Sequence, residues 1–134
     1  MPSTGRCLCG AIRYTLTAPP VSVLDCHCSI CRRESGAPSL VYVGYRRGDV
    51  SLSGSLRYFR ASGLARRGFC CNCGSPVCYE DDDDTQLIWL TAGTHDDAGF
   101  LPAREHVYVD DKLAWVEIPD AFRQWPGERG KAQG

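Results

Sequence analysis

Nine cysteines in a chain of 134 residues constrain the fold more than any other feature of the sequence. Eight of them fall into three clusters, at residues 7–9, 26–31 and 70–73, and Cys78 stands alone. An odd number cannot pair completely in disulfides. The first residues show no apolar run behind a basic head, so we expect no signal peptide and a reducing, cytoplasmic setting. Metal binding by the thiols is therefore the interpretation we favour.

The remaining composition describes an ordinary small protein. Its length suits one domain, which we expect at residues 1–126, and the Gly- and charge-rich residues 127–134 predict a disordered tail. No apolar run approaches the roughly 18 residues that a membrane-spanning helix needs. A formal net charge of −1 argues against broad binding to nucleic acid or to an anionic membrane. The oligomeric state stays open.

Strand patterns dominate the chain. Residues 11–17 alternate, with Ile12, Tyr14 and Leu16 on one face. A short helix is expected over residues 29–35, with Ser29 as its N-cap and Gly36 as its stop. Further strands are expected at residues 21–26, 39–45, 51–53, 56–59, 65–70, 76–80, 86–91 and 114–118.

The sequence also predicts two turns between strands. Gly54 separates two of the short strands and predicts a hairpin there. The five adjacent acids of residues 80–84 repel one another and lack the spacing of a calcium loop, so they predict a solvated hairpin tip. The expected fold is mainly β: one domain of short antiparallel strands with one or two short helices, held by a modest core and by metal.

The cysteine spacing suits tetrahedral zinc, which takes four soft ligands. Two clusters each offer a pair of thiols followed by a glycine, which permits the positive φ of a tight metal turn: Cys7 and Cys9 before Gly10, and Cys70 and Cys73 before Gly74. Two pairs make a closed site. The middle cluster offers three thiols, Cys26, Cys28 and Cys31, and three protein ligands leave the fourth position open, as in catalytic zinc.

The residues alone leave other groupings open. A cysteine of the middle cluster could join either pair in a single site, and Cys71 could replace Cys70. We expect Cys78, in an apolar strand, to be a small buried hydrophobe. His27 lies between two proposed ligands, so its side chain should point away from their metal. His95 and His106 are expected to be surface or packing residues.

Four arginines could take part in substrate binding. Arg32 and Arg33 follow the middle cluster directly, and Arg66 and Arg67 lie on a predicted strand. Such residues are normally solvated charges. Beside an open zinc their forked guanidinium groups could instead receive carboxylates, and we predict Arg32 and Arg33 as substrate-binding residues.

Three motifs in order resemble the glutathione-dependent formaldehyde-activating enzyme family, which also includes centromere protein V. They are GRCLCGAIRY at residues 5–14, CHCSICRR at 26–33 and FCCNCGSP at 69–76, and EHVYV with KLAW at 105–115 resembles the family's closing motif. The match covers about residues 5–118. The resemblance implies a β-tent fold with two zinc ions. It places a structural zinc on Cys7, Cys9, Cys70 and Cys73 and a catalytic zinc on Cys26, Cys28 and Cys31.

The resemblance also implies a reaction. A small thiol such as glutathione would bind at the open zinc and add to an aldehyde such as formaldehyde. This chemistry is that of a carbon–sulfur lyase of the S-hydroxymethylglutathione synthase type. The alternative is a non-catalytic zinc module that serves as a glutathione carrier or as a protein-interaction domain. A redox switch that uses Cys71 and Cys78 is a third interpretation.

Overall fold

The computed structural model describes residues 3–99, 104–119 and 121–129. Within these residues no helix has the length and apolar character needed to cross a bilayer. The elements follow the chain in this order: β1 (Ser3–Arg6), β2 (Arg13–Leu16), β3 (Ser22–Cys26), α1 (Ser29–Ser35), β4 (Leu40–Arg46), η1 (Arg47–Asp49), β5 (Val50–Ser53), β6 (Leu56–Ser62), β7 (Ala65–Cys70), β8 (Pro76–Asp81), β9 (Asp84–Thr91), η2 (Ala92–Thr94), β10 (Glu105–Val107) and η3 (Val109–Asp111).

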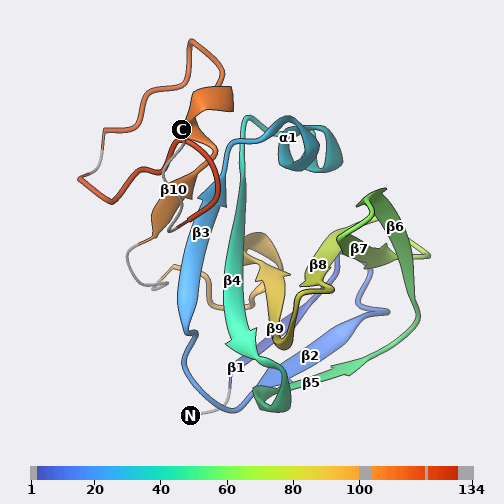
Figure 1. The fold of residues 1–134 in the computed structure, drawn as a ribbon. Coiled ribbons are helices and arrows are strands. Elements are labelled where there is room, and N and C mark those ends of the chain that lie inside the picture. Colours follow the sequence, from blue (N-terminus) through green and yellow to red (C-terminus); the bar gives the residue numbers. More distant parts are fainter. Residues whose placement is uncertain (1–2, 100–103, 120, 130–134) are drawn as a thin grey trace.

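The strands of the described chain form two sheets (Figure 1). One has the order β1-β2-β5, and the other has the order β10-β3-β4-β9-β8-β7-β6. A core cluster joins the two sheets, and Ile12, Leu16, Val43 and Leu90 are among its fully buried members. The prediction of a mainly β fold with one or two short helices is confirmed. Its strands are antiparallel as expected, except that β10 runs parallel to β3.

The alternation around β2 is realised in the structure. Ile12, Tyr14 and Leu16 are buried in the core cluster, whereas Arg13 and Thr15 are exposed. Successive side chains of a strand point to opposite faces, so one face packs and the other meets solvent. The prediction for this segment is confirmed.

The short helix also forms where it was predicted. α1 ends at Ser35 and is capped by Gly36, which has a positive φ of 71° and whose N–H donates to the Arg32 carbonyl. The predicted Ser29 cap is wrong, because Cys28 takes that position one residue earlier. Cys28 is extended, and its Sγ accepts a hydrogen bond from the Cys31 N–H at 3.3 Å.

The predicted hairpin at Gly54 does not form. β5 pairs with β2, and β6 pairs with β7, so the two strands belong to different sheets. Gly54 has φ of 103°, and a Cβ there would lie 2.3 Å from the Ala11 carbonyl oxygen. The glycine therefore lets the chain leave one sheet for the other under close contact, rather than turn back on itself.

The predicted strand at residues 114–118 is wrong as well, because those residues lie in a turn and in unpaired chain. The late strand is β10, which pairs with β3 on one side and bridges Gln124 through His106 on the other. Figure 1 shows β10 beside β3. A strand of three residues is too short for alternation to reveal it in the sequence.

The acidic residues 80–84 do not all lie in a solvated turn. Residues 82 and 83 form the turn between β8 and β9, as a hairpin tip requires. Glu80 contradicts the prediction of a solvated tip, because it is 6% exposed. Its two carboxylate oxygens lie 2.6 Å from Arg47 Nη1 and 3.0 Å from Arg66 Nε. Two arginines that are distant in sequence thus compensate the buried charge.

The last described residues contact the body of the protein. The Gly127 carbonyl accepts from the Tyr108 N–H at 3.0 Å, and Arg129 Nη1 donates to Ser22 Oγ at 2.6 Å. Residues 130–134 lie outside the described residues. The boundary at residue 126 and the disordered tail stay predictions.

Candidate metal centre

Four thiols from two distant parts of the chain lie together. Cys7 and Cys9 come from the β1–β2 connection, Cys70 ends β7, and Cys73 lies in the turn that leads to β8. Their Sγ atoms all lie within 4.8 Å of one another, with 3.7 Å between Cys7 and Cys9 and 3.8 Å between Cys9 and Cys70. A zinc tetrahedron with bonds of about 2.3 Å to sulfur has edges of about 3.8 Å. The spacing therefore suits a tetrahedral metal.

Hydrogen bonds to sulfur favour the ionised form of these thiols. The Ile12 N–H donates to Cys7 Sγ at 3.3 Å, and the Cys73 N–H donates to Cys70 Sγ at 3.4 Å. The hydrogen bond between Cys73 and the Ser75 hydroxyl lowers the pKa of Cys73 to about 5. Burial and the hydrogen bonds with the Cys7 and Cys73 thiols instead raise the pKa of Cys70 to about 11, so the four thiols do not ionise alike.

The remaining two cysteines lie outside both groups of thiols. Cys71 is exposed, although it neighbours Cys70. Cys78 is 1% exposed, on β8 in the core cluster, which confirms that it is a small buried hydrophobe. Of the groupings that the residues left open, the structure brings together the four-thiol and three-thiol sets that the family resemblance implies.

The second cluster joins the end of β3 to the start of α1. The Sγ atoms of Cys26, Cys28 and Cys31 lie within 4.8 Å of one another. Hydrogen bonds with the thiols of Cys26 and Cys31 lower the pKa of Cys28, and the hydrogen bond with Cys28 in turn raises the pKa of Cys26 and helps to raise that of Cys31. Three soft donors at this strand–helix junction could hold a metal and leave one tetrahedral position free.

A buried ion pair lies against this cluster. Arg67, on β7, approaches Cys31 Sγ with its Nη1 at 3.5 Å and pairs with Glu34 of α1. The Tyr42 hydroxyl donates to Glu34 Oε1 at 2.7 Å. Sequence reasoning missed Glu34 and treated Arg67 as a normally solvated charge. The available signal was spacing, because Glu34 follows Cys31 by three residues and so shares its face of the helix.

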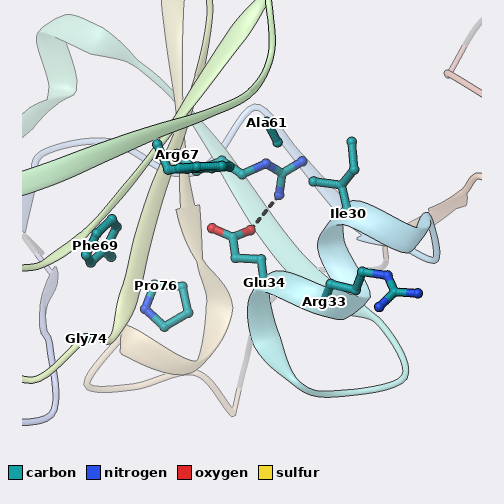
Figure 2. A pocket seen from close by; sticks show the side chains of 9 residues that line it. Ile30, Arg33, Glu34, Ala61, Arg67, Phe69, Gly74 and Pro76 are labelled. Carbon is teal, nitrogen blue, oxygen red and sulfur yellow. Dashed lines mark hydrogen bonds and ion pairs between the residues drawn. The ribbon is translucent and has the colours of Figure 1, made fainter.

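A pocket of about 430 Å³ is lined mainly by residues of α1, β6 and β7, and none of the three thiols is among them. Arg67 connects the pocket to the second cluster, because it lines the pocket and contacts Cys31 Sγ, and Figure 2 shows its side chain reaching toward Glu34. The walls are mostly apolar; the lining residues are Ile30, Arg33, Glu34, Phe59, Ala61, Arg67, Phe69, Gly74 and Pro76. A pocket of this size fits a small molecule.

The structure separates the two predicted substrate-binding residues. Arg33 lines the pocket, and Arg32 is absent from its lining. The Arg32 Nε is buried and has no hydrogen-bond partner among the described residues. Only Arg33 of this pair is thus placed to meet a ligand in the pocket, and substrate binding by either stays a prediction.

Two histidines lie in the interior of the protein rather than on its surface. His27 and His106 are each 2% exposed, and they lie beside Asp25, which is 7% exposed. The ring nitrogens of His27 group with these two residues rather than with the three thiols. His27 therefore turns away from the second cluster, as predicted. His95 is a buried packing residue whose Nε2 lies 2.8 Å from the Tyr45 hydroxyl.

Comparison with a solved structure shows the fold. A Rhodobacter sphaeroides protein of known crystal structure superposes with a TM-score of 0.63 and 20% sequence identity. The superposition covers 78% of this chain and 99% of that chain. The arrangement of the strands is therefore one that another protein also adopts.

Comparison with other sequences shows the family. A Halomonas elongata protein, provisionally named as a glutathione-dependent formaldehyde-activating enzyme, is 31% identical over 132 residues, covering 85% of this chain and 79% of the relative. An uncharacterized lyase of Schizosaccharomyces pombe is 28% identical over 112 residues, covering 81% of this chain and 79% of the relative. A family model described as glutathione-dependent formaldehyde-activating enzyme matches residues 2–111. This chain belongs to the glutathione-dependent formaldehyde-activating enzyme family.

Proposed function

We propose that this protein joins a small thiol such as glutathione to an aldehyde such as formaldehyde, as a carbon–sulfur lyase with zinc at both cysteine clusters. The observation that carries the proposal is the connection between the three-thiol cluster and the pocket, with Arg67 in contact with Cys31 and also in the pocket wall. The family description and the names of the two relatives support an enzyme of this class.

The donor set fits the metal. Cys26, Cys28 and Cys31 offer three soft thiolates, and zinc in catalytic sites takes three protein ligands. When bound, zinc would supply an open position that stabilises a substrate thiol in its ionised form at neutral pH. The four-thiol cluster offers a complete set of ligands and suits a structural role.

Two arginines of the pocket could stabilise charge in the reaction and bind the substrate. Thiol addition forms a bond from sulfur to the carbonyl carbon, breaks the π bond of the carbonyl, and moves the thiol proton to the carbonyl oxygen. The Arg67 guanidinium, held by Glu34, is placed to stabilise negative charge that develops on that oxygen. Arg33 lines the same pocket, and we expect its guanidinium to bind a carboxylate of the thiol.

The test compares Cys28→Ser with Cys71→Ser, a matched control because Cys71 is exposed and outside both clusters. Calorimetric titration of glutathione should show binding to wild type and to the control, and none to Cys28→Ser. Because the adduct also forms without an enzyme, exchange between formaldehyde and the S-hydroxymethyl adduct is measured by NMR above the uncatalysed rate. Equal binding by both variants would contradict a thiol site at this cluster.

The same experiment distinguishes the enzyme from the non-catalytic alternatives. Glutathione binding that depends on Cys28, without any gain in the exchange rate, would assign the protein as a carrier. Absence of binding to wild-type protein with full metal content would favour an interaction module.

A further inference from the structure

A third group of ligand-type side chains lies on the opposite side of β3 from the thiols. Asp25, His27 and His106 are all more than nine-tenths buried. His27 Nε2 lies 3.1 Å from His106 Nδ1, His106 Nδ1 lies 3.4 Å from Asp25 Oδ2, and His27 Nε2 lies 3.9 Å from Asp25 Oδ2. These three atoms therefore converge in the interior of the protein.

The backbone explains why they meet. Along β3 and the residue after it, Asp25 and His27 lie on one face and Cys26 lies on the other, and Cys28 follows as the N-cap of α1. The parallel pairing of β10 with β3 places His106 directly opposite Asp25. One short segment thus presents a thiol to one side and a carboxylate with an imidazole to the other.

We propose that Asp25, His27 and His106 form a third metal site, which binds zinc and fastens β10 to β3. Zinc bonds of about 2.0–2.2 Å to nitrogen and oxygen place tetrahedral ligands about 3.4 Å apart, and the three observed separations lie around that value. A second observation points to the same ligand. Asp25 Oδ1 is buried without a hydrogen-bond partner, an arrangement that is costly for a carboxylate oxygen. A metal bound by both carboxylate oxygens would satisfy it.

Nearby cations make this site weaker than the thiol sites. Arg104 Nε lies 3.7 Å from Asp25 Oδ2, and the positive charge of Lys112 also acts on His27. The Arg104 side chain is 41% exposed and so has room to withdraw toward solvent. Lys112 Nζ is held by the carbonyls of Leu113 and Val116. The third zinc should therefore leave first when a chelator is added.

The experiment measures zinc per chain in full-length protein equilibrated with a zinc buffer. Wild type should hold about three equivalents, one for each group of ligands, and His106→Gln about two. His95→Gln is the matched control, because His95 is also buried but lies outside the group, and it should hold about three. Zinc-edge X-ray absorption should show imidazole scattering in wild type and a clear loss of it in His106→Gln.

A second variant distinguishes the loss of a metal ligand from the loss of the fold. His106→Cys supplies another zinc ligand and should restore the third equivalent if His106→Gln loses it. Where a variant fails to fold by circular dichroism, wild-type protein decides the question by itself. Only two equivalents and no imidazole scattering in wild type, or an unchanged metal content in folded His106→Gln, would overturn the proposal. The imidazole signal does not depend on thiol binding, so this site and the proposed function can fail separately.

Discussion

Replacing Glu34 by glutamine should destabilise the protein by removing one half of a buried ion pair. The side chains of Arg67 and Glu34 are only 11% and 16% exposed. Loss of one partner from a buried pair costs about 3–5 kcal/mol, because the other charge stays uncompensated. Arg67 would keep its contact with Cys31 Sγ, so we expect the lower end, about 3 kcal/mol. For a chain of this length the melting temperature should fall by about 10 °C.

The assay is urea unfolding at a fixed free zinc concentration, because metal release would otherwise mix with unfolding. Asp82→Asn is the matched control: it removes the partner of Arg60 from an ion pair whose side chains are 50% and 45% exposed, and it should leave the midpoint almost unchanged. The double variant Glu34→Gln with Arg67→Met should cost no more than either single change, since the two residues act as a unit.

The reasoning is refuted by either of two results. One is a loss of less than about 1 kcal/mol in Glu34→Gln, which would place the pair among solvent-screened interactions. The other is simple addition of the two single effects in the double variant, which would show that the residues do not depend on each other.

Three further predictions concern metal, packing and pH. Cys73→Ser should lose the zinc of the four-thiol cluster and a large part of its thermal stability, whereas Cys71→Ser should keep both; metal analysis and melting curves check this. Gly5→Ala should lower the melting temperature, because a Cβ at this position would lie 2.1 Å from the ring of Tyr14. Burial lowers the pKa of His95 in the folded state, so the unfolded chain takes up the proton first and stability falls as the pH drops below about 6.5. His95→Gln should show a smaller fall between pH 7 and pH 5.5 in the same unfolding assay.

The sequence by itself determined the features that depend on neighbours along the chain. The alternation of Ile12, Tyr14 and Leu16 predicted a half-buried strand, because side chains of a strand alternate between faces. Residues 29–35 and Gly36 predicted a short helix with its stop. The spacing within each cysteine cluster predicted thiols that converge, since a few residues can bring such side chains together only in a tight turn.

Only the tertiary structure decided which distant residues meet. Glu80 reads as part of a solvated acidic run, yet the pairing of strands brings it between Arg47 and Arg66. Glu34 and Arg67 lie 33 residues apart and meet because β7 lies near α1 beside the pocket. His106 meets Asp25 through a parallel strand of three residues. Long-range strand register is set by packing of the whole core, and no local pattern of residue types encodes it.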